Sequence, residues 1–155
     1  MFDLKLKFSW IGIVIFILPM FINIIYVIFP ATNASKEISS CNKALELVEQ
    51  VTRILYAISI CVLVSDKRTD FKSPWLYLSL LFLALYYIVW IRYFVGGRDI
   101  ALLGKSFMFI PLPLAIFPVL YYLFASIWLH NGIAIIFIII FGIAHNVVSY
   151  VSLYK

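Results

Sequence analysis

The sequence predicts an all-α polytopic integral membrane protein, a bundle of five transmembrane helices joined by short loops. Of its 155 residues, 65% are hydrophobic and only 12% are charged, and the mean hydropathy is +1.09. A water-soluble domain of this length needs many more polar side chains to cover its surface, whereas a bilayer tolerates Leu, Ile and Phe that point outward. We therefore treat residues 1–155 as a single membrane domain.

The first helix is predicted over residues 8–29. The uncharged run 8–35 exceeds the roughly 20 residues that cross about 30 Å of hydrocarbon. It is also longer than the apolar region of a signal peptide, which has about 7–15 residues, so we expect it to remain in the protein.

The second helix is predicted over residues 44–65, and it is the least regular of the five. Its apolar part, 54–65, is too short to span a bilayer alone, so the helix must include the polar segment 43–53. This assignment places charged side chains inside the membrane, where each is expensive unless it faces protein or water.

Three more helices are predicted over residues 75–94, 106–129 and 133–154. Pro74 precedes the first of them, at a position where a missing N–H costs nothing. Residues 106–154 contain no Asp, Glu, Lys or Arg, and this stretch is long enough for two helices. The turn-like sequence at His130, Asn131 and Gly132 divides it into a tight helical hairpin.

Four prolines are expected to kink helices. Pro111, Pro113 and Pro118 lie within the fourth predicted helix, and Pro19 lies in the first, near Asn23. Each removes a backbone donor and frees a carbonyl one turn earlier. Irregular backbone at membrane depth is tolerated where it is buried or lines a cavity, so the cluster of three favours a cavity there.

The second predicted helix carries polar residues on one face, because they are spaced at i, i+3, i+4 and i+7. These residues are Glu46, Glu49, Gln50 and Arg53. Glu49 and Arg53 can form a pair. One interpretation is a polar pocket that binds an ion, a proton or an anionic headgroup; the other is a helix end in water from which Arg53 snorkels.

The last predicted helix carries a second polar patch. It comprises His145, Asn146, Ser149 and Tyr150. Such residues often serve as hydrogen-bonding partners between membrane helices. In the alternative interpretation His145 is a titratable group that faces Glu49 and Arg53 across a cavity.

Two further features concern the third predicted helix and the loop that follows it. Tyr86 and Trp90 lie one turn apart, as in an interfacial aromatic belt. Arg92 and Arg98 flank a Gly-Gly pair, so they are candidate contacts for an anionic headgroup or substrate.

Two short patterns resemble motifs of the membrane-embedded CAAX-type proteases, which carry EExxxR and FxxxH helices. Here they are Glu49-x-x-x-Arg53 and Phe141-x-x-x-His145. The resemblance implies that Glu49 would activate a water molecule and that His145 would assist. Val48 stands where the family has its first Glu, and no second His motif follows.

The charge pattern bears on location and partners. The net charge is +5, but the bases are dispersed over several loops, which indicates contact with anionic lipid and no nucleic-acid binding. Lys and Arg are nearly balanced between the two sides, and the first helix favours a cytoplasmic N-terminus. The heavy use of Ile, Phe, Lys and Tyr suggests a bacterial cytoplasmic membrane.

Three function classes remain open at this stage. The first is a component that binds or transports a small molecule, lipid or ion through a polar intramembrane cavity. The second is an intramembrane hydrolase-like enzyme that uses Glu49 and His145. The third is an interaction, immunity or accessory subunit, in a homo-oligomer or a larger membrane complex. Cys41 and Cys61 form no cysteine framework, and no cofactor or metal ion is expected.

Overall fold

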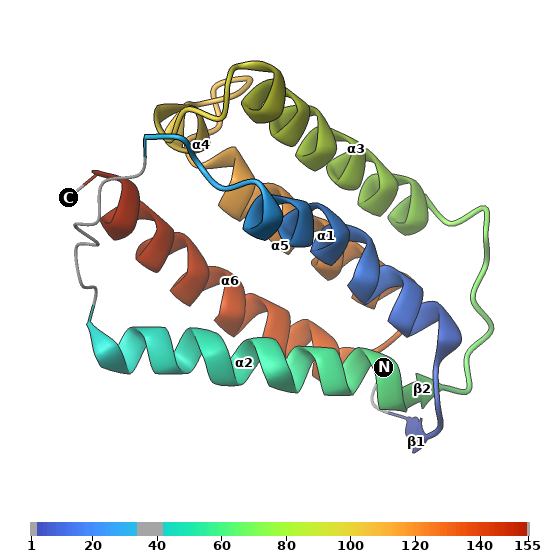
Figure 1. Ribbon diagram of the computed structural model, residues 1–155. Helices are drawn as coiled ribbons and strands as arrows, with labels where there is room; N and C mark the ends of the chain where they lie inside the picture. Colours follow the sequence, from blue (N-terminus) through green and yellow to red (C-terminus); the bar gives the residue numbers. More distant parts are fainter. Residues whose placement is uncertain (1–2, 34–41, 155) are drawn as a thin grey trace.

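The computed structural model describes residues 3–33 and 42–154, which form a helical bundle (Figure 1). Its helices are α1 (Trp10–Ile28), α2 (Lys43–Val62), α3 (Pro74–Val95), α4 (Ala101–Gly104), α5 (Pro113–Trp128) and α6 (Gly132–Tyr154). α3 packs on α5, α5 on α6 and α6 on α2. α1 crosses in front of this layer and packs mainly against α2 (Figure 1).

Three of the helices are long and apolar enough to cross a membrane, by length and composition. They are α1, α3 and residues 132–152 of α6, and together they indicate an integral membrane protein. α5 is apolar but has only 16 residues, and α2 carries four charged residues along its length. The five-helix bundle is therefore present, whereas a five-span topology remains a prediction.

The second helix ends at Val62, so its predicted extension to residue 65 is wrong. The chain continues as β2 (Leu63–Ser65), which pairs antiparallel with β1 (Leu4–Leu6). The N-terminal segment also donates to the last turn of α2, from Lys7 N to Val62 O at 2.9 Å. The strand pair thus takes up carbonyls that a continuing helix would have used.

The fourth long helix begins at Pro113, so its predicted start at residue 106 is wrong. Residues that precede a proline avoid the right-handed helical region, and two prolines, at positions 111 and 113, therefore keep this stretch out of the helix. Leu112 instead adopts a left-handed conformation with φ 52°. The predicted kinks at Pro111 and Pro113 are wrong as well, because Pro111 precedes α5 and Pro113 opens it, while Pro118 lies inside.

Pro19 lies inside α1, where it cannot donate to the carbonyl oxygen of Ile15. The Tyr121 hydroxyl of α5 donates to that oxygen at 2.9 Å. The next residue, Tyr122, donates to Phe16 O, also at 2.9 Å. Two tyrosines thus bind the freed stretch of α1 to α5.

Close helix contacts and a polar clamp complete the packing. Gly12 of α1 lies so near α2 that a Cβ atom would overlap the carbonyl oxygen of Ile60. Asn131, in the turn between α5 and α6, is 1% exposed and donates to the carbonyls of Ser59 and Leu63, each at 2.9 Å. The hairpin predicted at residues 130–132 is therefore present, and it is bonded to the end of α2.

Polar contacts outside the helices join the connections at both ends of the bundle. Lys5 Nζ lies 2.8 Å from Asp66 Oδ2, and this hydrogen bond raises the pKa of Lys5. At the other end Asn33 donates to Asp99 Oδ1 at 2.9 Å. The bonds from Asn33 and from the Ala101 N–H lower the pKa of the Asp99 carboxyl.

The contact between Pro19 and Tyr121 yields a prediction about stability. We expect Tyr121→Phe to destabilise the protein by about 1 kcal/mol, because Ile15 O loses its donor. Pro19→Ala restores an N–H at that position, so Tyr121→Phe should cost clearly less in the Pro19→Ala background. Thermal unfolding of the four proteins in detergent measures this cycle. An equal cost of Tyr121→Phe in both backgrounds would contradict the assignment.

Candidate functional site

A cavity of about 470 Å³ lies between the helices and is partly open to the outside. Side chains from α1, α2, α3, α5 and α6 line it. Most of the wall is apolar and aromatic, and the polar groups are few. They belong to Asn23, Tyr26, Arg53, Tyr86, Trp90, Tyr122, His145 and Ser149. This volume is in the range of about 300–1,000 Å³ typical of small-molecule sites.

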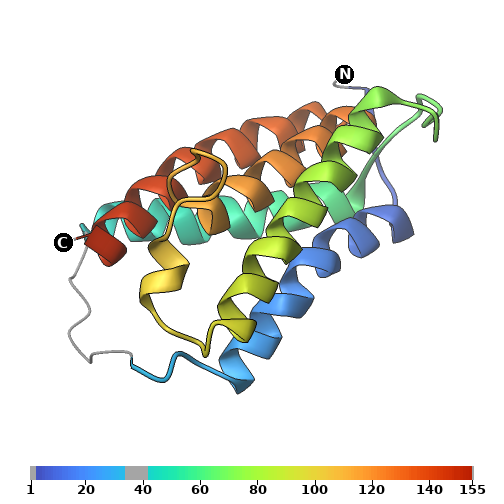
Figure 2. The ribbon, with the colours of Figure 1, turned by 90° about the horizontal axis from the view of Figure 1, so that it is seen from above.

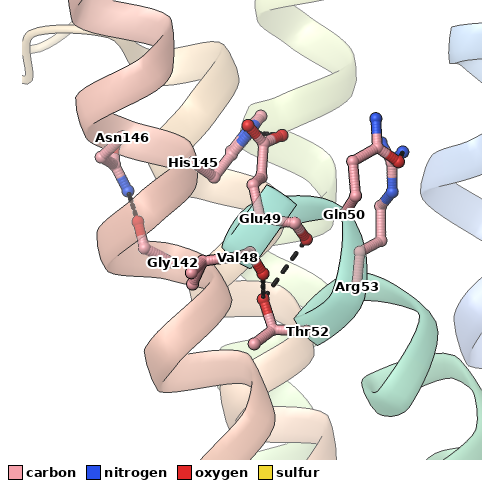
Figure 3. A network of polar contacts seen from close by, with 8 residues as sticks. All are labelled: Val48, Glu49, Gln50, Thr52, Arg53, Gly142, His145 and Asn146. Carbon is pink, nitrogen blue, oxygen red and sulfur yellow. Dashed lines mark hydrogen bonds and ion pairs between the residues drawn. The ribbon is translucent and has the colours of Figure 1, made fainter. Parts of the chain in front are cut away.

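Glu49 and His145 form a side-chain hydrogen-bond contact between α2 and α6. Glu49 Oε1 lies 3.0 Å from His145 Nδ1, and the two side chains are 13% and 26% exposed. Figure 3 shows the carboxylate reaching from α2 to the imidazole. The ring of His145 also stacks on Phe141, with centroids 4.9 Å apart. Packing and the carboxylate together fix the ring where it borders the cavity.

Arg53 does not pair with Glu49, so that part of the sequence interpretation is wrong. Its Nη2 donates to Gln50 Oε1 at 2.6 Å, and both side chains extend away from the Glu49–His145 contact (Figure 3). Glu49 is turned toward α6, which leaves the exposed Arg53 at the cavity without a carboxylate among the described residues.

Arg53 lies at the middle of α2. The helix has 20 residues, Lys43–Val62, so Arg53 is about 14 Å from either end by the rise per residue. If α2 crosses the bilayer, the guanidinium lies near its centre. A cation at that depth needs protein, water or an anion around it.

The other predicted polar residues divide between the cavity and the helix contacts. Ser149 lines the cavity with His145. Asn146 donates to Gly142 O at 2.7 Å, and its buried Oδ1 has no partner among the described residues. Glu46 is half-buried and Tyr150 exposed, and neither lines the cavity.

Tyr86 and Trp90 were expected in an interfacial belt, and that interpretation is wrong. They are 2% and 5% exposed, and both line the cavity. The Tyr86 hydroxyl donates to Asn23 Oδ1 at 2.7 Å, whereas Trp90 Nε1 has no partner among the described residues. The one-turn spacing of Tyr86 and Trp90 gave a helix face, but only the fold shows that this face points inward.

Arg92 is bound to the protein's own backbone, which argues against its role as an anion contact. Its guanidinium donates to the carbonyls of Ser106, Leu102 and Lys105 at 3.0, 3.2 and 2.7 Å. Arg98 has a left-handed backbone with φ 61°, and its carbonyl accepts from Thr32 N at 3.1 Å. Neither arginine lines the cavity.

In the described part of the chain, no three His, Cys, Asp or Glu side chains lie close enough to hold a metal ion. Cys61 is a free thiol, and Cys41 lies outside the described residues. Among the described residues, the cavity is bordered by one cation, Arg53, and by one imidazole, that of His145, which a carboxylate orients. This set suits a ligand with an apolar body and a group that accepts hydrogen bonds.

A scan against protein-family models and searches of curated proteins and of solved structures found no match to this chain.

The Glu49–His145 contact yields a second prediction. We expect Glu49→Ala and His145→Ala each to lower stability, with a coupling between them of about 0.6–2 kcal/mol, because either change leaves a half-buried polar partner. A double-mutant cycle of thermal unfolding measures this coupling. The exposed Gln50, paired with His145 in a parallel cycle, is the control and should show no coupling. Equal coupling in both cycles would contradict a specific contact.

Proposed function

We propose that this protein is a membrane-embedded binding component for an amphipathic anion, with all five long helices crossing the bilayer. The observation that carries the proposal is that Arg53 borders the cavity, bonded to the Gln50 side chain and with no carboxylate beside it in the part of the chain that the structure describes. A guanidinium at that depth is stabilised by an anionic group that enters the cavity.

The remaining cavity wall supports an amphipathic ligand. Tyr26, Trp90, Tyr122 and Phe141 supply aromatic surface for an apolar body. Asn23 and Ser149 add polar groups to this wall. Fatty-acid-like and phospholipid-like molecules combine these properties, and the surrounding membrane supplies them. Transport, in addition to binding, would require the bound ligand to leave the cavity on the other side of the membrane.

The proposal also includes the membrane in which the protein lies and its orientation there. In a five-span topology the N- and C-terminal ends lie on opposite sides of a membrane. We propose a bacterial cytoplasmic membrane with the N-terminus inside, on the strength of Lys5 and Lys7 before α1 and of three bases between α2 and α3.

The test uses single-chain amphiphiles of one length in dodecyl maltoside micelles. We expect dodecyl phosphate to raise the unfolding temperature of the wild type, and dodecyltrimethylammonium not to do so. Arg53→Gln should lose most of this stabilisation, at least three-fold in apparent affinity, because the charged hydrogen bonds are gone. Arg68→Gln, in the loop between α2 and α3, is the matched control and should keep it.

Inorganic phosphate provides the arm that separates an amphiphile from a free anion. Stabilisation by inorganic phosphate alone would point to a small anion. If dodecyl phosphate stabilises Arg53→Gln as well as the wild type, the cavity is not the binding site and the proposal fails.

A second candidate function, hydrolysis inside the membrane, is favoured by the Glu49–His145 contact. With Nδ1 held by Glu49, the Nε2 atom of His145 would take a proton from water as that water adds to an ester or amide carbonyl. The same nitrogen would then return the proton to the leaving group. Asn146 follows His145 on α6, and Ser149 lies one turn further along the same helix.

The hydrolysis test is the release of fatty acid from a long-chain ester by the purified protein in vesicles. If this function is correct, His145→Ala and Glu49→Ala should each lower the rate at least 100-fold, while Gln50→Ala leaves it near the wild-type value. A wild-type rate no greater than that of the His145→Ala variant would exclude hydrolysis of this ester, without affecting the binding proposal.

A further inference from the structure

The segment between α4 and α5 presents two large apolar side chains outward. Met108 is 67% exposed and Phe109 is 104% exposed. Both have left-handed backbone conformations, with φ 47° and 66°, which are unfavourable for residues other than glycine. Holding Met108 and Phe109 in these backbone conformations therefore costs conformational free energy, which the rest of the fold offsets.

Part of the backbone of this segment is bonded within the protein. Phe107 N donates to Ile110 O at 3.1 Å, and Ile110 N donates to Phe107 O at 2.9 Å. Before the turn, the Arg92 guanidinium donates to the carbonyls of Leu102, Lys105 and Ser106. At the tip, the backbone groups of Met108 and Phe109 have no hydrogen bond within the described residues. Because hydrocarbon does not tolerate irregular backbone without partners, the backbone of the tip belongs at headgroup level, where water supplies partners, and only the side chains can enter the hydrocarbon.

The segment lies at one end of the bundle. Figure 1 shows the chain there beside α4 and the C-terminal end of α3, and Figure 2 shows α4 joining that end of α3 to the segment. α5, which follows, has 16 residues and spans only about 24 Å, less than the hydrocarbon thickness of about 30 Å. Residues 106–112 contain no charged residue, so they can complete this crossing.

We infer that residues 106–112 form an apolar turn at the membrane interface, which inserts the side chains of Met108 and Phe109 among lipid acyl chains. Arg92 acts as a positioning residue, because it binds three carbonyls at the start of the turn. The guanidinium also lies 5.7 Å from the centre of the Phe107 ring, where the ring face attracts a cation. Lys105, exposed at the start of the turn, can reach the headgroups. This inference does not rest on the cavity.

The experiment measures the depth of a nitroxide attached to Phe109→Cys. Both native cysteines are changed to serine, and the full chain is reconstituted in vesicles of phosphatidylcholine and phosphatidylglycerol. We expect the label at 109 to collide more with oxygen than with a water-soluble nickel chelate. Ile17→Cys, on the outer face of α1, should behave alike, and Arg68→Cys should show the opposite preference. A label at 109 that behaves like the label at 68 would overturn the inference.

Two further measurements test whether a second copy of the chain covers the turn in place of lipid, and whether Arg92 positions the turn. Spectral broadening at 109 that disappears on dilution with unlabelled protein would place a second copy of the chain on the turn, and would overturn lipid insertion. Arg92→Gln should raise the collision rate with the chelate at 109 at least three-fold, whereas Arg98→Gln should not.

If Arg92→Gln fails to fold, Arg92→Lys provides a second test of the same role. A lysine keeps the charge but cannot reach three carbonyls with the planar geometry of arginine, so it should raise the same collision rate. If chelate access at 109 is unchanged in every folded Arg92 variant, Arg92 does not position the turn.

Discussion

The need to satisfy backbone carbonyls in an apolar environment governs most of this structure. Each place where the chain departs from a regular helix leaves polar backbone groups that hydrocarbon cannot solvate. At Pro19 the freed carbonyl receives a tyrosine hydroxyl from α5. At the turn before α6, Asn131 closes two carbonyls of the α2 end. At the turn before α5, Arg92 closes three. These hydrogen bonds join segments that are far apart in the chain, and they add to the two hydrophobic clusters that pack the helices together.

This constraint separates polar side chains that build the fold from those that remain available. Thr52 and Ser59 return their hydroxyls to carbonyls one turn earlier in α2, at 2.6 and 2.7 Å, and Ser126 does the same in α5 at 2.8 Å. These residues are used by the backbone. Arg53 is not used in this way: among the described residues it binds only the Gln50 side chain, and it borders the cavity. The proposal of a ligand therefore depends on Arg53.

The sequence alone was sufficient where a single physical signal dominated. Long uncharged runs placed α1, α3 and α6 within a few residues of their actual bounds, and the polar break at residues 130–132 placed the hairpin. Prediction from the sequence failed at residues 106–112, where hydrophobicity favoured a helix and two prolines disfavoured it. Local backbone sterics prevailed, because residues before proline avoid the helical region. The contact of Glu49 with His145 was one of two interpretations left open, since periodicity gives a face but not the neighbour it meets.

Arg92 and Arg53 show why the presence of an arginine in a membrane protein does not by itself identify a ligand site. Arg92 and Arg53 are both expensive to place in hydrocarbon, and each would be read from sequence as a candidate for an anion. The guanidinium of Arg92 donates to three carbonyl oxygens of the chain itself, and its Nε atom is buried without a partner among the described residues, so most of its donors are bonded to backbone or enclosed by the fold. The guanidinium of Arg53 meets one amide oxygen, from Gln50, and a guanidinium has five N–H donors. The difference in unused donors, rather than the charge that the two share, favours Arg53 as the residue that receives a ligand.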